Sequence, residues 1–215
     1  MMKRTLCIVA LAAAALAGCS SPEPEKKKEV AVPKKSQLAP PVYTVNLDTS
    51  KGPVAIEVHR EWAPNGADHF YNLVKAGFYD NARFFRVVRN FVVQFGIAAD
   101  PATQRLWENA NLPDDPVVER NTRGMVTYAT RGPNTRSTQI FIILRDNRQS
   151  LDRQGFAPFG KVTTGMDIVD GFYNSYGDMP PQGQGPDPSQ IQLQGNAYLE
   201  SRFPRLDYIR KATIQ

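Results

Sequence analysis

The stretch from Phe84 to Gly96 constrains the fold of this 215-residue chain more than any other. It is an apolar run, dense in β-branched and aromatic residues, which is typical of a buried or half-buried strand. Arg89 and Asn90 interrupt the run where a turn would suit it. Arg86 and Gln94 do not belong in a plain core strand, because a buried polar side chain needs a partner. We therefore expect this stretch to turn back on itself and its polar side chains to have a functional role.

Two further stretches mix strand-forming and polar residues in the same way. Residues 124–143 are expected to form a strand, a polar loop rich in Gly and Pro, and a second strand that begins near Gln139 and Phe141. Residues 151–162 lead from Leu151 and Asp152 into another short apolar segment.

Together these stretches resemble the cyclophilin-type peptidyl-prolyl isomerases. The resemblance extends from about Val42 to the end of the chain, and three ordered motifs with the correct spacing are a specific signal. The positions that match the family's patterns are Phe84-Phe85-Arg86-Val87, Phe91, Gln94 and Gly96, then Ala129, Gly132-Pro133-Asn134-Thr135, Gln139 and Phe141-Ile142, and finally Phe159-Gly160-Lys161-Val162.

The resemblance implies a mainly β fold, a closed antiparallel β-barrel capped by two helices. It also implies a peptidyl-prolyl cis-trans isomerase without cofactor or metal, which acts on proline-containing polypeptides, and we expect a monomer. By the same resemblance the catalytic residues are Arg86, Phe91 and Gln94. The residues that would line the proline pocket or hold the substrate are Val92, Ala129, Thr130, Gln139, Phe141, Leu151 and Phe156.

The chemistry of proline isomerisation explains why Arg86 suits a catalytic role. The barrier of about 20 kcal/mol is the lost resonance of the twisted amide, and no bond is broken. The prolyl nitrogen gains a lone pair as it becomes pyramidal, so a donor aimed at it stabilises the transition state selectively. Arginine is a positively charged side chain with a rigid fork of donors.

The sequence also departs from the family pattern around the pocket. Phe85 stands where the family usually has a His, Val92 replaces a Met, and Thr130 replaces an Asn. Ser150 occupies the position of a common Trp, and Phe156 or Gly155 that of the pocket His. We expect these changes to reshape the pocket more than to remove catalysis.

Residues 1–18 are predicted to be a signal peptide, with Lys3 and Arg4 followed by an apolar run that is too short to span a membrane. The run ends in Leu16-Ala17-Gly18-Cys19, which resembles a bacterial lipobox and implies that Cys19 is lipidated. We therefore expect a protein held in the cell envelope through a lipid anchor, facing the periplasm or the exterior. The following Ser fits outer-membrane sorting if the host is Gram-negative. An ordinary secretory leader with a chance Cys is the alternative.

Residues 19–41 are rich in Pro, Glu, Lys and Ser and are expected to form a disordered linker after the lipidated Cys. The isomerase domain is predicted to cover residues 42–215. The formal charge is +5, and loss of the two basic residues of the leader lowers it to about +3, from 24 Lys and Arg against 21 Asp and Glu. Because five Lys lie in the linker, the domain is close to neutral and nucleic-acid binding is not indicated.

Other elements follow from local pattern. We expect a hairpin over residues 42–58, a helix from Ala63 that ends at Gly77, and a long loop over residues 97–121. A second helix is predicted over residues 165–173, irregular chain over 177–189, a short helix over 191–199 and a last strand over 206–214.

The rival interpretation is a binding module, in which the same groove holds proline-containing segments as an envelope chaperone or scaffold with little turnover. The presence of Arg86 with Phe91, Gln94 and Phe141 favours the enzyme, because a binder could lose the arginine. A purely structural envelope lipoprotein would have no need of the groove motifs. His59 and His69 stand without Cys or paired carboxylates at metal-ligand spacing, and we expect them to be structural.

Overall fold

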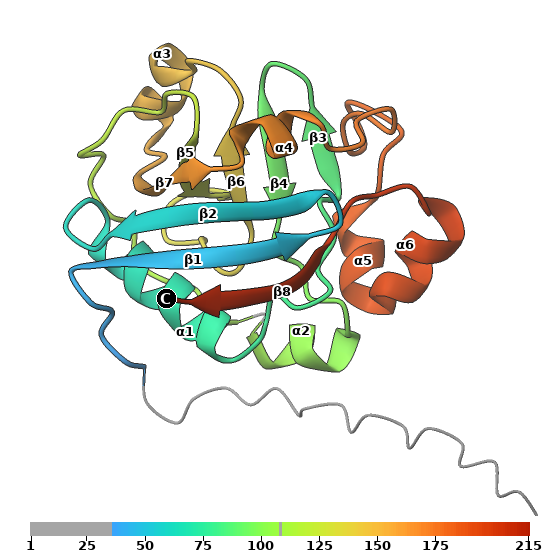
Figure 1. The fold of residues 1–215 in the computed structure, drawn as a ribbon, viewed down its shortest axis with the longest axis horizontal. Coiled ribbons are helices and arrows are strands. Elements are labelled where there is room, and N and C mark those ends of the chain that lie inside the picture. The colour runs from blue at the N-terminus through green and yellow to red at the C-terminus, as the bar shows by residue number, and fades with distance from the viewer. Residues whose placement is uncertain (1–35, 108) are drawn as a thin grey trace, which may run out of the picture.

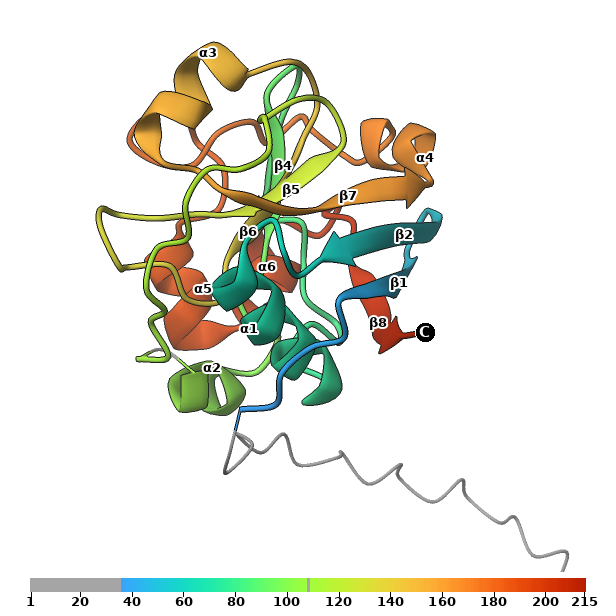
Figure 2. The same ribbon diagram turned by 90° about the vertical axis from the view of Figure 1, so that its left-hand side faces the viewer.

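The computed structural model describes residues 36–107 and 109–215. Its main component is an antiparallel sheet in the spatial order β3-β4-β6-β5-β7-β2-β1-β8. The strands are β1 Val42–Thr49, β2 Gly52–His59, β3 Arg86–Val88, β4 Val92–Phe95, β5 Met125–Tyr128, β6 Ile140–Ile143, β7 Pro158–Thr164 and β8 Ile209–Ile214. In Figures 1 and 2, β4 stands upright while β2 runs across the view, so the sheet curls as it passes from one edge to the other.

The closed barrel that was expected is not seen among the described residues, where only one isolated bridge joins the two edges of the sheet. The end strands β3 and β8 share no ladder among the described residues. The chain just before each of them forms a single antiparallel bridge, Arg83 to Tyr208. Two backbone hydrogen bonds flank this bridge: the N–H of Phe84 donates to Asp207 over 3.0 Å, and that of Ile209 to Ala82 over 2.9 Å. The fold is therefore mainly β, and its antiparallel sheet curls into a half-barrel.

The predicted hairpins form as expected. β1 and β2 pair from Val42 opposite His59 to Thr49 opposite Gly52, so two residues make the turn. β3 and β4 pair around a turn in which Asn90 adopts a positive φ of 56°, a conformation that Asn tolerates better than most residues.

The described residues form more helices than expected, since the sequence predicted two that cap the barrel and a short one over 191–199. They are α1 Pro64–Lys75, α2 Pro101–Trp107, α3 Arg148–Leu151, the 3₁₀ turn η1 Asp152–Gln154, α4 Met166–Asp170, α5 Pro188–Gln194 and α6 Asn196–Arg202. Figures 1 and 2 place α2 and α3 at opposite ends of the molecule. None of the helices within the described ranges is long and apolar enough to cross a membrane.

Three local predictions need correction. The segment 97–121 is not wholly a loop, because the Asp100 carboxylate accepts the N–H of Thr103 over 2.9 Å and begins α2. The helix predicted over 165–173 stops early, since α4 ends at Asp170 and Gly171 is its C-cap. The short helix predicted over 191–199 is two helices, which meet at Gly195 with a positive φ of 59°.

The segment 36–41, expected to belong to the linker, lies against α1. The backbone N–H of Gln37 donates to Asn72 over 3.0 Å, and that of Ala39 donates to Asp68 over 2.8 Å. The Ala39 side chain is buried in the main core. The ordered contacts thus begin before the predicted boundary at residue 42. The predicted signal peptide, Cys19 and the linker as far as residue 35 lie outside the described residues.

The core lies between the sheet and α1, and aromatic rings dominate it. The ring of Phe70 on α1 packs 5.5 Å from Tyr79 and 5.2 Å from Phe159, and Tyr128 lies 5.1 Å from Phe159. The buried hydroxyls are satisfied, since Tyr79 donates to Thr138 over 3.0 Å and Tyr128 donates to Gly66 over 3.1 Å. Burial of such rings is the main stabilising contribution of this core.

Candidate functional site

A cross-strand row places three predicted site residues side by side. Arg86 on β3 pairs with Gln94 on β4, and Gln94 pairs in turn with Phe141 on β6. Directly opposed residues in antiparallel strands project to the same face, so their side chains are neighbours. The sheet register therefore sets a charged fork, an amide and an aromatic ring next to one another.

The polar members of the site form a connected chain. Arg86 donates from one terminal nitrogen to Gln94 Oε1 over 3.0 Å, and Gln94 Nε2 donates to Gln139 Oε1 over 3.0 Å. The guanidinium carbon also lies 5.5 Å from the centre of the Phe91 ring, within cation–π range. These contacts orient the Gln94 amide, since its oxygen accepts from Arg86 while its nitrogen donates onward.

The other edge of the Arg86 guanidinium meets a carboxylate that the sequence analysis did not single out. Arg86 Nε donates to Asp178 Oδ1 over 2.7 Å, and a terminal nitrogen donates to Asp178 Oδ2 over 3.1 Å. Burial of the Asp178 carboxyl opposes its ionisation, but the hydrogen bonds and positive charge of Arg86 outweigh that effect and lower its pKa. The carboxylate is therefore ionised at neutral pH.

Next to these polar side chains lies a small apolar cluster, separate from the main core. Its buried members are Val92, Met125, Phe141, Ile143 and Leu151. The ring of Phe156 packs against it and lies 5.5 Å from Phe141 in an edge-on arrangement. A concave apolar floor beside a few fixed polar groups is the usual form of a ligand site.

The polar side chains of Arg86, Gln94 and Gln139 and part of the apolar cluster line one groove with a cavity volume of about 490 Å³. All ten side chains predicted for catalysis or substrate binding line it: Arg86, Phe91, Val92, Gln94, Ala129, Thr130, Gln139, Phe141, Leu151 and Phe156. The structure thus brings the predicted residues together, and the individual roles assigned to them stay predictions.

The rim at Ala129 and Thr130 is shaped by its own loop. The N–H of Ala129 donates to the carbonyl of Gln139 over 2.9 Å, which continues the pairing of β5 and β6. The Thr130 hydroxyl donates to Gly132 over 2.5 Å and lies 2.9 Å from the hydroxyl of Thr135. The loop that resembled a family motif therefore holds its shape through short side-chain contacts.

Sequence reasoning missed part of the groove lining. These side chains come from two segments of irregular composition and are Gln104, Asn111, Met179, Pro188 and Gln192. Asp178 was missed as well. The one available signal was Arg86 itself, because an arginine on an apolar strand calls for an acidic partner, although nothing local says which one.

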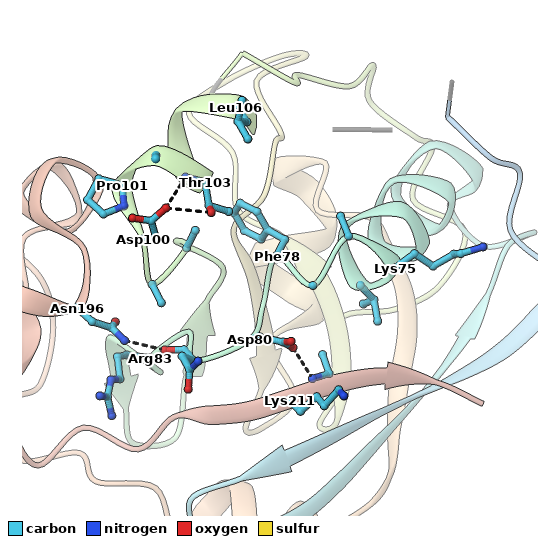
Figure 3. Close-up of a pocket in the computed structure, with 18 of the residues that line it drawn as sticks. Lys75, Phe78, Asp80, Arg83, Asp100, Pro101, Thr103, Leu106, Asn196 and Lys211 are labelled. Carbon is cyan, nitrogen blue, oxygen red and sulfur yellow. Dashed lines mark hydrogen bonds between the residues drawn. The ribbon is translucent and has the colours of Figure 1, made fainter. Parts of the chain in front are cut away.

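A second, larger hollow of about 1710 Å³ lies elsewhere, between the end of α1, α2, α6 and β8 (Figure 3). Three of its polar groups have structural roles. Asp80 accepts the N–H of Ala212 over 3.0 Å, Asp100 caps α2, and Asn196 donates to Asn81 over 3.0 Å. Its size reflects an open surface, and we assign the chemistry to the smaller groove.

Both histidines are engaged in packing. His59 lies 2.8 Å from Glu57 and stacks 3.9 Å from Trp62, while the His69 ring meets Trp107 at 5.8 Å. Over the described ranges, no group of three or more His, Cys, Asp or Glu side chains is placed to hold a metal ion.

Comparisons with known proteins show the family and the fold. Residues 44–189 match the family described as "Cyclophilin type peptidyl-prolyl cis-trans isomerase/CLD". The chain is 34% identical over 131 residues to peptidyl-prolyl cis-trans isomerase CYP18-2 of Arabidopsis thaliana, a match that covers 58% of this chain and 77% of that protein. It is 34% identical over 134 residues to a peptidyl-prolyl cis-trans isomerase of Acinetobacter baylyi, covering 60% of this chain and 71% of that one.

Solved structures show the same fold at lower sequence identity. A cyclophilin-type peptidyl-prolyl cis-trans isomerase of Cryptosporidium parvum superposes with a TM-score of 0.56 at 22% identity, over 81% of this chain and 98% of that one. The cyclophilin AquaCyp293 of Hirschia baltica gives a TM-score of 0.59 at 19% identity, over 82% and 75% of the two chains.

Proposed function

The chain belongs to the cyclophilin-type peptidyl-prolyl cis-trans isomerase family and is an enzyme of that class, and on this premise we propose that it works in the cell envelope. There it isomerises X-Pro bonds of extracytoplasmic polypeptides and assists their folding. It acts as a monomer and is held to a membrane by lipid on Cys19. In a Gram-negative host that membrane is the outer one.

The proposed chemistry centres on Arg86. A bound proline ring rests on the apolar floor at Phe141, while Gln94 and Gln139 hold the peptide backbone. As the amide twists, the prolyl nitrogen becomes pyramidal and accepts a hydrogen bond from the guanidinium. This bond forms in the transition state and is absent from the planar ground state, which is the condition for catalysis.

The rate enhancement that an isomerase needs is larger than Arg86 alone can supply. Raising a rate of about 10⁻² s⁻¹ to about 10³ s⁻¹ requires roughly 7 kcal/mol. A single preorganised donor is worth about 3–4 kcal/mol. The remainder comes from holding the ring and the neighbouring carbonyl in a twisted geometry, which is the work of the apolar floor and the glutamines.

The location rests on one observation, the segment Leu16-Ala17-Gly18-Cys19 after a short apolar run. Its order and position fit cleavage before the Cys and acylation of the new N-terminus. More than one acyl chain gives stable membrane anchoring, whereas a single chain gives only reversible binding. The client would then be reached from a tether, since residues 20–35 separate the anchor from the described domain.

The test compares the two cysteines of the chain. Cys19→Ala is expected to leave the protein uncleaved or released, without lipid on its N-terminal peptide in mass spectrometry. Cys7→Ala is the matched control, because Cys7 lies within the predicted leader and its loss should change neither lipidation nor fractionation. A cleaved Cys19→Ala protein that still fractionates wholly with membranes contradicts the lipid anchor, whatever the isomerase activity.

A further inference from the structure

The segment that follows α4 is docked against the strand that carries Arg86. Phe85, the residue before Arg86, is buried in a satellite cluster with Ile97, Ile191, Leu199 and Leu206. This cluster joins α5 and α6 to the start of β3, and Figure 1 shows the two helices beside that strand. Because successive residues of an extended chain point to opposite faces, Phe85 anchors the helices while Arg86 faces the groove.

Asp178 belongs to the same segment, and its own loop holds it in place. Its carboxylate accepts the N–H of Met179 over 2.7 Å, and its carbonyl accepts the N–H of Gly185 over 2.8 Å. A Cβ on Gly183 would overlap that carbonyl, so the loop closes tightly around Asp178. The carboxylate is therefore presented to Arg86 from a preformed position.

The contact between Arg86 and Asp178 is bidentate, a geometry that holds an arginine side chain firmly. Two parallel charge-assisted hydrogen bonds join the fork to both carboxylate oxygens, at 2.7 and 3.1 Å. Both side chains are largely buried, with 17% of the Arg86 side chain and 22% of the Asp178 side chain exposed. A paired guanidinium loses the rotational freedom that a long side chain otherwise keeps in a groove open to water.

The pair also leaves donors available. Among the described residues, three of the five N–H groups of Arg86 have acceptors, two on Asp178 and one on Gln94. Two N–H groups remain for a substrate. Asp178 therefore restricts the plane of the guanidinium without occupying all of its donors.

We propose that Asp178 is a positioning residue of the isomerase reaction, which holds the Arg86 guanidinium in the plane that aims its remaining N–H groups at the prolyl nitrogen. It acts through Arg86 and does not touch the substrate. The proposal rests on the catalytic role proposed above for Arg86. It also explains why the segment that follows α4, far from the family's motifs, contacts β3 on both faces. Phe85 packs against α5 and α6 on one face, and Arg86 binds Asp178 on the other.

The experiment measures isomerisation of a short Ala-Pro peptide by purified protein. Asp178→Ala is expected to lower kcat by about tenfold, the scale of a misplaced catalytic group, while KM changes by less than about threefold. Asp178→Asn should fall between this variant and the wild type, because its amide oxygen can still accept one hydrogen bond. The Arg86 Nε–H resonance in NMR should broaden or shift in both variants as the guanidinium regains motion.

The matched control is Asp170→Ala. Asp170 also binds both terminal nitrogens of an arginine, Arg123, at a surface outside the groove. Its removal should leave kcat and KM unchanged, so a general effect of breaking an arginine–carboxylate pair is separated from positioning.

The double mutant separates positioning from loop structure. In an Arg86→Ala background, Asp178→Ala should change kcat by less than about twofold, because a residue that acts through Arg86 has nothing left to position. An equal loss in both backgrounds, unchanged activity of Asp178→Ala, or increased activity that marks Asp178 as a brake would each overturn the proposal. If Arg86→Ala alone keeps full activity, the catalytic role of Arg86 fails instead.

Discussion

At the scale of single residues, the site depends on a polar chain that runs from β3 across β4 to the residue before β6. Arg86, Gln94 and Gln139 are linked by hydrogen bonds of 3.0 Å, and each of them also lines the groove. Such a chain orients each member through its neighbour, so removal of one is felt by the others. Arg86 stands at its end, between the chain and Asp178.

Arg86→Ala is expected to lower kcat/KM by about 10²–10³, the range for removing one donor aimed at developing charge. Arg86→Lys should restore little of this, because a flexible ammonium reproduces neither the planar fork nor the bidentate contact with Asp178. Turnover is measured by exchange NMR on an Ala-Pro peptide, and affinity by a separate titration that should change much less. A folded Arg86→Ala protein with near-full activity would refute the role.

At the scale of elements, the approach of β4 to the start of β6 is set by Gly96. Its φ of +104° is disfavoured for other residues, and a Cβ there would overlap the carbonyl oxygen of Thr138 and come within 2.9 Å of the Gln139 Cα. Thr138 is held from both sides, since its hydroxyl donates to Gly96 over 2.8 Å and its carbonyl accepts from Tyr79 over 3.0 Å. The backbone next to Gln139 cannot shift to make room.

Gly96→Ala should therefore lower the free energy of unfolding by on the order of 4 kcal/mol, since steric overlap adds to backbone strain. Gly132→Ala is the matched control, because Gly132 also has a positive φ, of +138°, but a Cβ there meets nothing within 4 Å. Strain alone should make the control lose about 1–3 kcal/mol in urea unfolding. Equal losses for the two variants would show that close packing at Gly96 is unimportant.

At the scale of the whole molecule, His69 lies where α1, α2 and the sheet pack together. Its ring lies 5.8 Å from Trp107 and 6.2 Å from Tyr128, and its Nε2 is buried without a partner among the described residues. Burial lowers the pKa of His69 to about 4, and the nearby charge of Arg136 acts in the same direction. The folded protein therefore keeps this ring neutral where the unfolded chain protonates it.

This predicts how stability depends on pH. Because the unfolded state binds more protons between the ordinary histidine value of about 6.5 and the folded value of about 4, stability falls as the pH is lowered through that window. His69 alone should lower the free energy of unfolding by about 2 kcal/mol between pH 7 and pH 5. Urea unfolding followed by Trp fluorescence measures the slope. His69→Gln should flatten it, and a slope that persists in the variant would assign the effect to other groups.

Much of the site was predictable from the sequence because its determinants are local. The run of β-branched and aromatic residues and the Arg89-Asn90 interruption are enough to predict the β3–β4 hairpin, since strand propensity and turn residues act over a few positions. Once that hairpin forms, Arg86 and Gln94 must face each other. The match to family motifs then predicted the ten groove residues, all of which line one cavity.

Tertiary structure alone decided the rest of the groove lining and the partner of Arg86. Asp178 lies 92 positions away in a Gly- and Pro-rich segment, and no local pattern selects it over the other acidic residues. The pairing exists because Phe85 and the apolar faces of α5 and α6 share one buried cluster, which carries Asp178 to the groove. Which apolar faces meet depends on the packing of the whole chain, and that is a global balance of burial against chain entropy that no short stretch contains.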